Sequence, residues 1–142
     1  MKNLNLIPGI QGIDHIGIAV KSLEDSIKFY EEVLGAKLVH TEVNADQNIS
    51  EAMMDLHGQT IQLLAPLSDR GAIHDFLVKY GEGVQQIALK VANLDYACSA
   101  ARNNGIAVIF AQHKRGSSDS RINFLHPRDC GGVLLELVES AG

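Results

Sequence analysis

Four polar side chains occupy matching places in two similar stretches of this chain. The segments GIDHIGIAV and GVQQIALKV put His15 and Gln86 at the same position, and the later segments TIQLL and VLLEL do the same for Gln62 and Glu136. Imidazole nitrogens and carboxylate or amide oxygens are groups that bind cations or transfer protons. Glu136, which stands between two leucines, is costly to bury without a cation or a hydrogen-bond donor. The four residues are therefore candidates for one site, on the hypothesis that the two copies pack around a pseudo-twofold axis.

The elements that must position these residues also repeat. Aligning Gly12 with Gly83 gives an offset of 71 residues, and a helical pattern follows in each copy. Ser and Asn are favoured N-cap residues, and Gly is favoured just after a helix ends. These signals predict helices within 22–35 and 93–105, with Ser22 and Asn93 as N-caps and Gly35 and Gly105 at the ends.

Each predicted helix is followed by three apolar segments that resemble strands. They cover 37–43, 49–56 and 60–67 in the first copy, and 107–113, 121–127 and 133–140 in the second. Each half therefore follows the order strand, helix, strand, strand, strand, which predicts an α+β fold of two βαβββ modules. We expect a single domain over 1–142, with modules at about 12–67 and 83–139. The linker at 68–82 contains a short predicted helix near 72–79.

Composition excludes several classes of function. The chain has 142 residues, 46% of them hydrophobic, which suits one globular domain with a real core. Its net charge is −5 and it has no basic stripe, which argues against nucleic acid or an anionic membrane as a partner. No apolar run approaches the roughly 18 residues that a membrane span needs. Two cysteines without a pairing framework and the absence of a signal-peptide pattern favour a cytoplasmic protein with reduced thiols.

Several motifs resemble those of the vicinal oxygen chelate superfamily, which includes glyoxalases, bleomycin resistance proteins and dioxygenases. They are DHIGIAV, FYEEVLGA, SEAMM, QLLAPL, RINFLHP and GGVLLEL, and together the resemblance spans about residues 12–139. DHIGIAV is common in the superfamily, whereas QLLAPL, RINFLHP and LLEL are more specific to its methylmalonyl-CoA epimerases. The resemblance implies paired βαβββ modules, a homodimer and an acyl-CoA-type substrate.

Family members bind a divalent metal ion through two His, one Gln and one Glu. The resemblance carries this role to His15, Gln62, Gln86 and Glu136, but Gln86 stands where the epimerases usually have His. An amide oxygen is a weaker ligand than imidazole for late first-row metals. We therefore expect a weakened, retuned site that favours Mn²⁺ or Mg²⁺ and still accepts Co²⁺ or Zn²⁺. Loss of the metal is the main alternative.

The resemblance also implies a metal-dependent epimerase that transfers the proton alpha to a thioester carbonyl. It assigns one catalytic base to Glu51, in SEAMM, and the second to Glu136, which also serves as a ligand. Apolar neighbours such as Met53 and Met54 favour a raised pKa for the Glu51 carboxyl, as a general base needs. The resemblance further suggests Asn123 and Arg121 as substrate-binding residues.

Two other functions are compatible with the sequence. A glyoxalase-type isomerase or lyase would use the same metal and proton-transfer chemistry, although QLLAPL and RINFLHP disfavour it. A non-catalytic, resistance-type binding protein would lack the metal, and Gln86 is consistent with it, whereas Glu51 argues against it. An extradiol dioxygenase is disfavoured because its iron takes two His and one carboxylate, and the four positions supply a single His.

Overall fold

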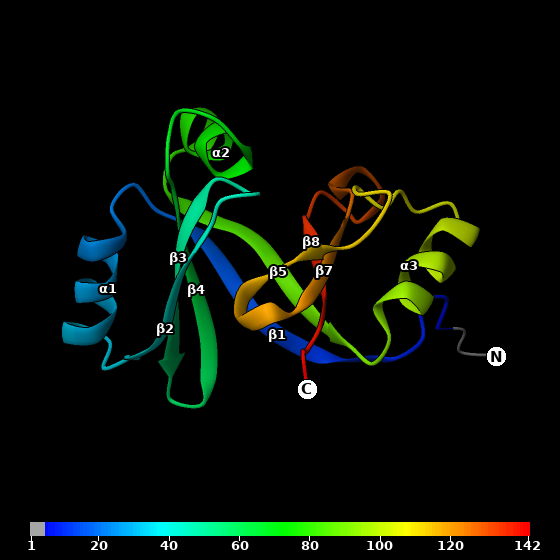
Figure 1. The fold of residues 1–142 in the computed structure, drawn as a ribbon, viewed down its shortest axis with the longest axis horizontal. Helices are drawn as coiled ribbons and strands as arrows, with labels where there is room; N and C mark the ends of the chain where they lie inside the picture. The colour runs from blue at the N-terminus through cyan, green and yellow to red at the C-terminus, as the bar shows by residue number, and fades with distance from the viewer. Residues whose placement is uncertain (1–4) are drawn as a thin grey trace. The chain divides into compact units, whose positions relative to one another are not determined.

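The computed structural model describes residues 5–142. Its elements follow the expected order in both halves (Figure 1). The first half contains β1 (Ile10–Ala19), α1 (Leu23–Glu32), β2 (Lys37–Asn44), β3 (Ile49–Leu56) and β4 (Gln59–Pro66). After α2 (Ala72–Tyr80), the second half contains β5 (Gly83–Val91), α3 (Leu94–Asn103), β6 (Lys114–Arg115), β7 (Arg121–Leu125) and β8 (Leu135–Glu139). This confirms the α+β prediction of two βαβββ modules.

The residues form two compact units whose boundaries fall inside strands. One unit is His15–Gln85, and the other joins Gln86–Gly142 to the described residues that precede His15. The boundaries therefore cut β1 and β5 and do not coincide with the ends of the modules expected from the repeat. We refer to His15–Gln85 as the first unit and to the other as the second unit.

In the first unit the strands lie in the order β2-β3-β4-β1. The pairs β2–β3 and β3–β4 are antiparallel, and β4–β1 is parallel. Helix α1 covers one face, where Ala52, Met54 and Leu63 are fully buried (Figure 1). Helix α2 packs through Ile73 against Leu64 on the other face. Burial of these apolar side chains, at roughly 25 cal/mol per Å², holds the helices on the sheet.

In the second unit the strands lie in the order β5-β8-β7-β6. The pair β5–β8 is parallel, and β8–β7 and β7–β6 are antiparallel. Helix α3 packs on β7 and β8 through Leu94 and Ala97, which meet Leu125 and Leu137 (Figure 1). These contacts show that α3 covers one face of the sheet. The strand residues that alternate with Leu125 and Leu137 project from the opposite face.

The predicted helix caps are confirmed. Ser22 accepts a hydrogen bond from the Asp25 amide, and Asn93 accepts one from the Tyr96 amide. Gly35 and Gly105 have φ angles of +71° and +76°, which only glycine adopts without strain.

The predicted strand at 107–113 is wrong. The segment forms one isolated bridge, Val108 to Leu125, and the following strand β6 has only two residues. The buried Asn123 side chain accepts from the Phe110 amide and donates to the Phe110 carbonyl, each at 3.0 Å. The Asn123 side chain thus takes the place of the backbone hydrogen bonds that a paired strand would make. The apolar pattern of the segment does not reveal this substitution.

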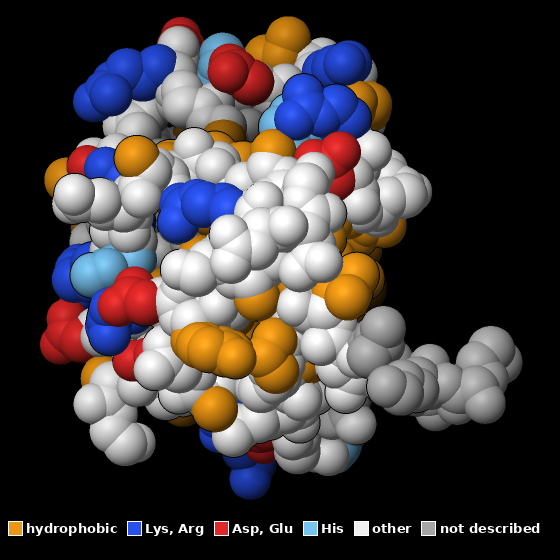
Figure 2. Space-filling view, turned by 90° about the vertical axis from the view of Figure 1, so that its right-hand side faces the viewer, with side chains coloured by type: hydrophobic (Ala, Val, Ile, Leu, Met, Phe, Trp, Pro, Cys, Tyr) orange, Lys and Arg blue, Asp and Glu red, His pale blue; other side chains and the backbone are white. Residues whose placement is uncertain are grey.

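Figure 2 shows both acidic and basic side chains on one face of the molecule, separated by hydrophobic and other side chains. Among the described residues, none of the helices has the length and apolar character needed to cross a membrane.

Candidate functional site

One face of the first unit carries three of the predicted site residues. In the parallel pair Gly17 lies beside Gln62, so His15, two residues earlier in β1, shares the face of Gln62. Gln62 lies opposite Met53, which puts Glu51 on that face as well. The strand register therefore gathers an imidazole, an amide and a carboxylate on the face opposite to α1.

Glu51 and Gln62 are joined by a buried hydrogen bond. Nε2 of Gln62 donates to Oε2 of Glu51 at 2.8 Å. The exposed fractions are 2% for Glu51 and 4% for both Gln62 and His15, so these polar groups lie in the interior. Of the two amide atoms, the nitrogen donates to the carboxylate, and the oxygen is the type of atom that can bind a cation.

The second unit repeats this arrangement with Gln86 and Glu136. Ala88 lies beside Glu136 in the parallel pair β5–β8, so Gln86, two residues before Ala88, shares the face of Glu136. Nε2 of Gln86 donates to Oε1 of Glu136 at 3.0 Å, and the two residues are 5% and 4% exposed. Each unit thus buries one carboxylate against one glutamine amide.

The donor types suit a divalent metal ion of the harder class. His15 and Gln62 offer one imidazole nitrogen and one amide oxygen, and Gln86 and Glu136 offer an amide oxygen and a carboxylate. Within residues 5–142, no group of three or more His, Cys, Asp and Glu residues is arranged to hold a metal. Each unit therefore offers one amide oxygen, a ligand type that magnesium and manganese tolerate better than zinc does.

Arg121 and Asn123 lie on the opposite face from Glu136. Phe124 is the residue that pairs with Glu136 across β7–β8, so its neighbour Asn123 points to the α3 side. Arg121 binds Asp95 of α3 at 2.8 Å and Glu139 at 3.2 Å. The hydrogen bond that Arg121 donates to Asp95 is the main cause of the raised pKa of Arg121. These contacts link α3 to β8 and support a structural role for Arg121, and the two hydrogen bonds with Phe110 support one for Asn123.

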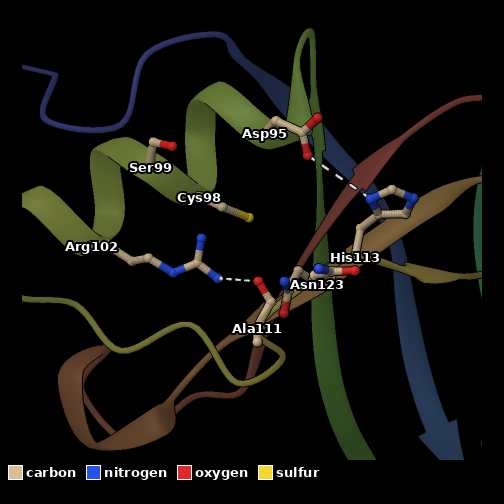
Figure 3. A pocket seen from close by; sticks show the side chains of 8 residues that line it. Asp95, Cys98, Ser99, Arg102, Ala111, His113 and Asn123 are labelled. Carbon is tan, nitrogen blue, oxygen red and sulfur yellow. Dashed lines mark hydrogen bonds and ion pairs between the residues drawn. The ribbon is translucent and has the colours of Figure 1, made fainter.

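A cavity of about 250 Å³ opens on this α3 side (Figure 3). Its wall includes Asn123, His113 and the helix residues Asp95, Cys98 and Arg102. Arg102 donates to the carbonyls of residues 110 and 111, and burial raises the pKa of the Cys98 thiol. Arg102 and Asn123 are thus engaged with the protein itself, and the cavity lies on the face of the sheet away from Glu136.

The sequence analysis missed Ser117, which lies in the loop before β7. Its hydroxyl oxygen is buried and has no hydrogen-bond partner among the described residues. The next two residues, Ser118 and Asp119, have φ angles of +55° and +58°, and non-glycine residues held in this region often mark functional sites. A Cβ on Gly116 would lie 2.6 Å from Ile122, so the loop requires glycine there. The run GSSDS is the signal that could have identified the loop.

Comparisons with known proteins agree with this architecture. The model of the Glyoxalase/Bleomycin resistance protein/Dioxygenase superfamily matches residues 14–124. Human mitochondrial methylmalonyl-CoA epimerase is 32% identical over 129 residues, which cover 90% of this chain and 73% of that protein.

Solved structures of epimerases are also similar. The methylmalonyl-CoA epimerase of Mycobacterium tuberculosis is 44% identical, with a TM-score of 0.91 over 100% of this chain and 94% of that one. A variant of the Streptomyces coelicolor enzyme in complex with 2-nitronate-propionyl-CoA is 42% identical, with a TM-score of 0.89 over 94% of this chain and 99% of that one. The chain therefore belongs to the Glyoxalase/Bleomycin resistance protein/Dioxygenase superfamily, in its methylmalonyl-CoA epimerase branch.

Proposed function

We propose that this protein is an epimerase that acts on methylmalonyl-CoA or a closely related acyl-CoA by moving the proton alpha to the thioester carbonyl. The observation that carries the proposal is the pair of buried carboxylates. Glu51 and Glu136 are 2% and 4% exposed, and each is held by a glutamine amide, at 2.8 and 3.0 Å. The complexes of the related epimerases with methylmalonyl-CoA and with 2-nitronate-propionyl-CoA support the substrate class.

The chemistry explains why two carboxylates are needed. Inverting the configuration at the alpha carbon requires that one group removes the proton and another returns a proton to the opposite face. We assign these roles to Glu51 and Glu136. Each glutamine amide fixes the orientation of its carboxylate, so that Gln62 and Gln86 position the bases.

We further propose that His15, Gln62, Gln86 and Glu136 are ligands of a divalent ion, with Mn²⁺ or Mg²⁺ favoured over Co²⁺ or Zn²⁺. When bound, such an ion stabilises the negative charge that develops on the carbonyl oxygen of the substrate. Three of the four ligand atoms would be oxygens, which supports the preference for harder ions.

Ser117 is our candidate for a polar contact to the substrate. A buried hydroxyl without a protein partner is costly, and a bound oxygen atom of the ligand would satisfy it. We also propose that the protein works as a homodimer. We propose in addition that it is cytoplasmic, and its two free cysteines support this location.

Deuterium exchange tests the function directly. Methylmalonyl-CoA is incubated with the protein in D₂O, and the alpha proton is followed by NMR, with the protein alone, with chelator, and with Mn²⁺, Mg²⁺ or Co²⁺ added back. We expect exchange that is lost with chelator and restored by metal. Exchange that resists chelator would remove the metal from the proposal. No exchange under any of these conditions would overturn methylmalonyl-CoA as the substrate and favour a binding protein.

A further inference from the structure

Gly17 is a buried glycine inside β1, on the face that carries the candidate site residues. It lies beside Gln62 in the parallel pair β1–β4. His15 and Ala19, two residues away on either side, project from the same face of the strand. Glycine weakens the interior of a strand because it is flexible and has no side chain to pack. This position is therefore one where a side chain would ordinarily be expected.

The backbone of Gly17 does not require glycine. Among the described residues nine glycines have a positive φ angle, and Gly17 is not one of them. It continues the regular ladder of β1 and β4, whose register is unbroken from Ile16 to Ala19. What distinguishes the position is therefore the missing side chain and not an unusual backbone conformation.

The second half of the chain has a side chain at the matching position. The offset of 71 residues that aligns the two halves pairs Gly17 with Ala88. Ala88 lies beside Glu136 in the parallel pair β5–β8 and is 0% exposed. The repeated strand thus carries a buried methyl group in the second half and none in the first. The methyl group is missing beside Gln62, which the proposed function places at the substrate.

The surroundings of Gly17 suit an alkyl group. Ala19 and Leu64 belong to one buried apolar cluster, and Leu64 lies directly opposite Glu51 in the pair β3–β4. The carboxylate of Glu51 extends over β4, because it accepts the hydrogen bond from Gln62, the neighbour of Gly17. A carbon atom whose proton Glu51 removes therefore has Gly17 and this apolar cluster within reach of its substituent.

We propose that Gly17 makes room for the substituent on the alpha carbon of the substrate, and so limits the size of the acyl groups that the enzyme accepts. This inference rests on the proposed function. A methyl group at position 17 would take the space of one carbon atom of the substituent. One methylene in an apolar pocket changes the discrimination between substrates by about 10–200-fold. Gly17 is thus a specificity-determining residue.

The test compares substrates that differ only in this substituent. Alpha-proton exchange in D₂O is followed by NMR for malonyl-CoA, methylmalonyl-CoA and ethylmalonyl-CoA, with Mn²⁺ present, and the exchange without enzyme is subtracted. We expect Gly17→Ala to stay within about threefold of wild type on malonyl-CoA and to lose about tenfold or more on the two alkylated substrates. Ethylmalonyl-CoA should lose at least as much as methylmalonyl-CoA.

Gly83→Ala is the matched control. Gly83 also lies in a strand, at the start of β5, and a Cβ there would have no described atom within 4 Å beyond its chain neighbours. The variant should leave the exchange rates of all three substrates unchanged.

Thermal melting separates this role from close packing inside the protein. If the space over Gly17 belongs to the substrate, Gly17→Ala should melt at or slightly above wild type, as Gly→Ala substitutions do where the backbone permits them. A lower melting temperature or a failure to fold would show that protein atoms need the glycine, and would overturn the inference. Equal losses on all three substrates would also overturn it. If wild type exchanges none of the three, the proposed function fails and this inference fails with it. Active wild type with an unaffected Gly17→Ala refutes the inference alone.

Discussion

The amide of Gln86 donates a 3.0 Å hydrogen bond to the carboxylate of Glu136, in the interior of the second unit. The repeat places this glutamine where the first half of the chain has His15. Gln86 has an amide where His15 has an imidazole, and this amide holds the Glu136 carboxylate. In the proposed metal site, this position would offer an amide oxygen in place of an imidazole nitrogen.

Replacement of Gln86 by His should strengthen the binding of late first-row metals. Imidazole nitrogen is the better ligand for Co²⁺ or Zn²⁺, so we expect Co²⁺ affinity to rise at least about tenfold, equivalent to about 1.4 kcal/mol. Isothermal titration calorimetry, with Co²⁺ added to the metal-free protein, measures this affinity. Gln85→His, at the neighbouring position of the same strand, is the control, because its side chain projects from the other face. Unchanged Co²⁺ affinity in Gln86→His would argue against Gln86 as a ligand.

Replacement of Glu51 by Gln should stop proton removal from one epimer of the substrate. The new side chain keeps the shape and still accepts the hydrogen bond from Gln62, but it cannot take a proton. We expect epimerisation to fall by about 10²–10⁴ with the melting temperature nearly unchanged. Alpha-proton exchange should persist for the epimer whose proton Glu136 removes. Glu31→Gln on the exposed face of α1 is the control, and equal loss of exchange for both epimers would contradict the two-base assignment.

The parts of the fold that could be predicted are those with local signals. The strand predicted at 49–56 coincides with β3, and the helix predicted near 72–79 corresponds to α2 at Ala72–Tyr80. Alternating burial and cap residues act within a few positions along the chain, so the sequence reveals them. The internal repeat then supplied the order of the elements in both halves.

The features that could not be predicted depend on contacts across strands. The bond network of Asn123 replaces regular pairing at 107–113, and it depends on which face of β7 this residue occupies. The same choice of face separates Arg121 and Asn123 from Glu136. The run GSSDS marks the loop of Ser117, but the burial of this hydroxyl without a protein partner depends on contacts that the sequence does not reveal.

Replacement of Asn123 by Ala distinguishes a structural role from substrate binding. The side chain bonds both the amide and the carbonyl of Phe110. Its loss leaves the amide unpaired, at a cost of about 1–3 kcal/mol, whereas the carbonyl keeps its bond from Arg102. Chemical denaturation should show a destabilisation of about 1–3 kcal/mol, whereas KM of the folded variant should change less than about threefold. Asn103→Ala, exposed at the end of α3, is the control. A large rise in KM without loss of stability would instead support a substrate contact.

Replacement of Asp129 by Asn should change the acid stability of the protein. The Ala107 amide donates to the Asp129 carboxylate at 2.9 Å, and this bond is the main reason why the pKa of Asp129 lies below its ordinary 3.8. A lowered pKa in the folded state stabilises the fold above the ordinary value, and this contribution is lost as pH falls through the folded pKa. Wild type should therefore melt higher than Asp129→Asn at pH 6, and the difference should shrink as the pH falls through the lowered pKa of Asp129. A difference that is independent of pH would contradict this origin.

Replacement of Ser117 by Ala should weaken substrate binding and leave the fold intact. The hydroxyl has no protein partner among the described residues, so its removal takes away a buried polar group at no cost in hydrogen bonds, and stability should stay the same or rise slightly. If the hydroxyl binds an oxygen of the substrate, kcat/KM should fall about tenfold, which corresponds to about 1.4 kcal/mol of lost interaction. Steady-state kinetics and thermal melting of the same preparation separate the two effects. Ser99→Ala, in the cavity on the α3 side, is the matched control and should leave kcat/KM unchanged, because that cavity lies on the face of the sheet away from Glu136. An equal loss of kcat/KM in both variants would place the substrate contact elsewhere and remove Ser117 from the site.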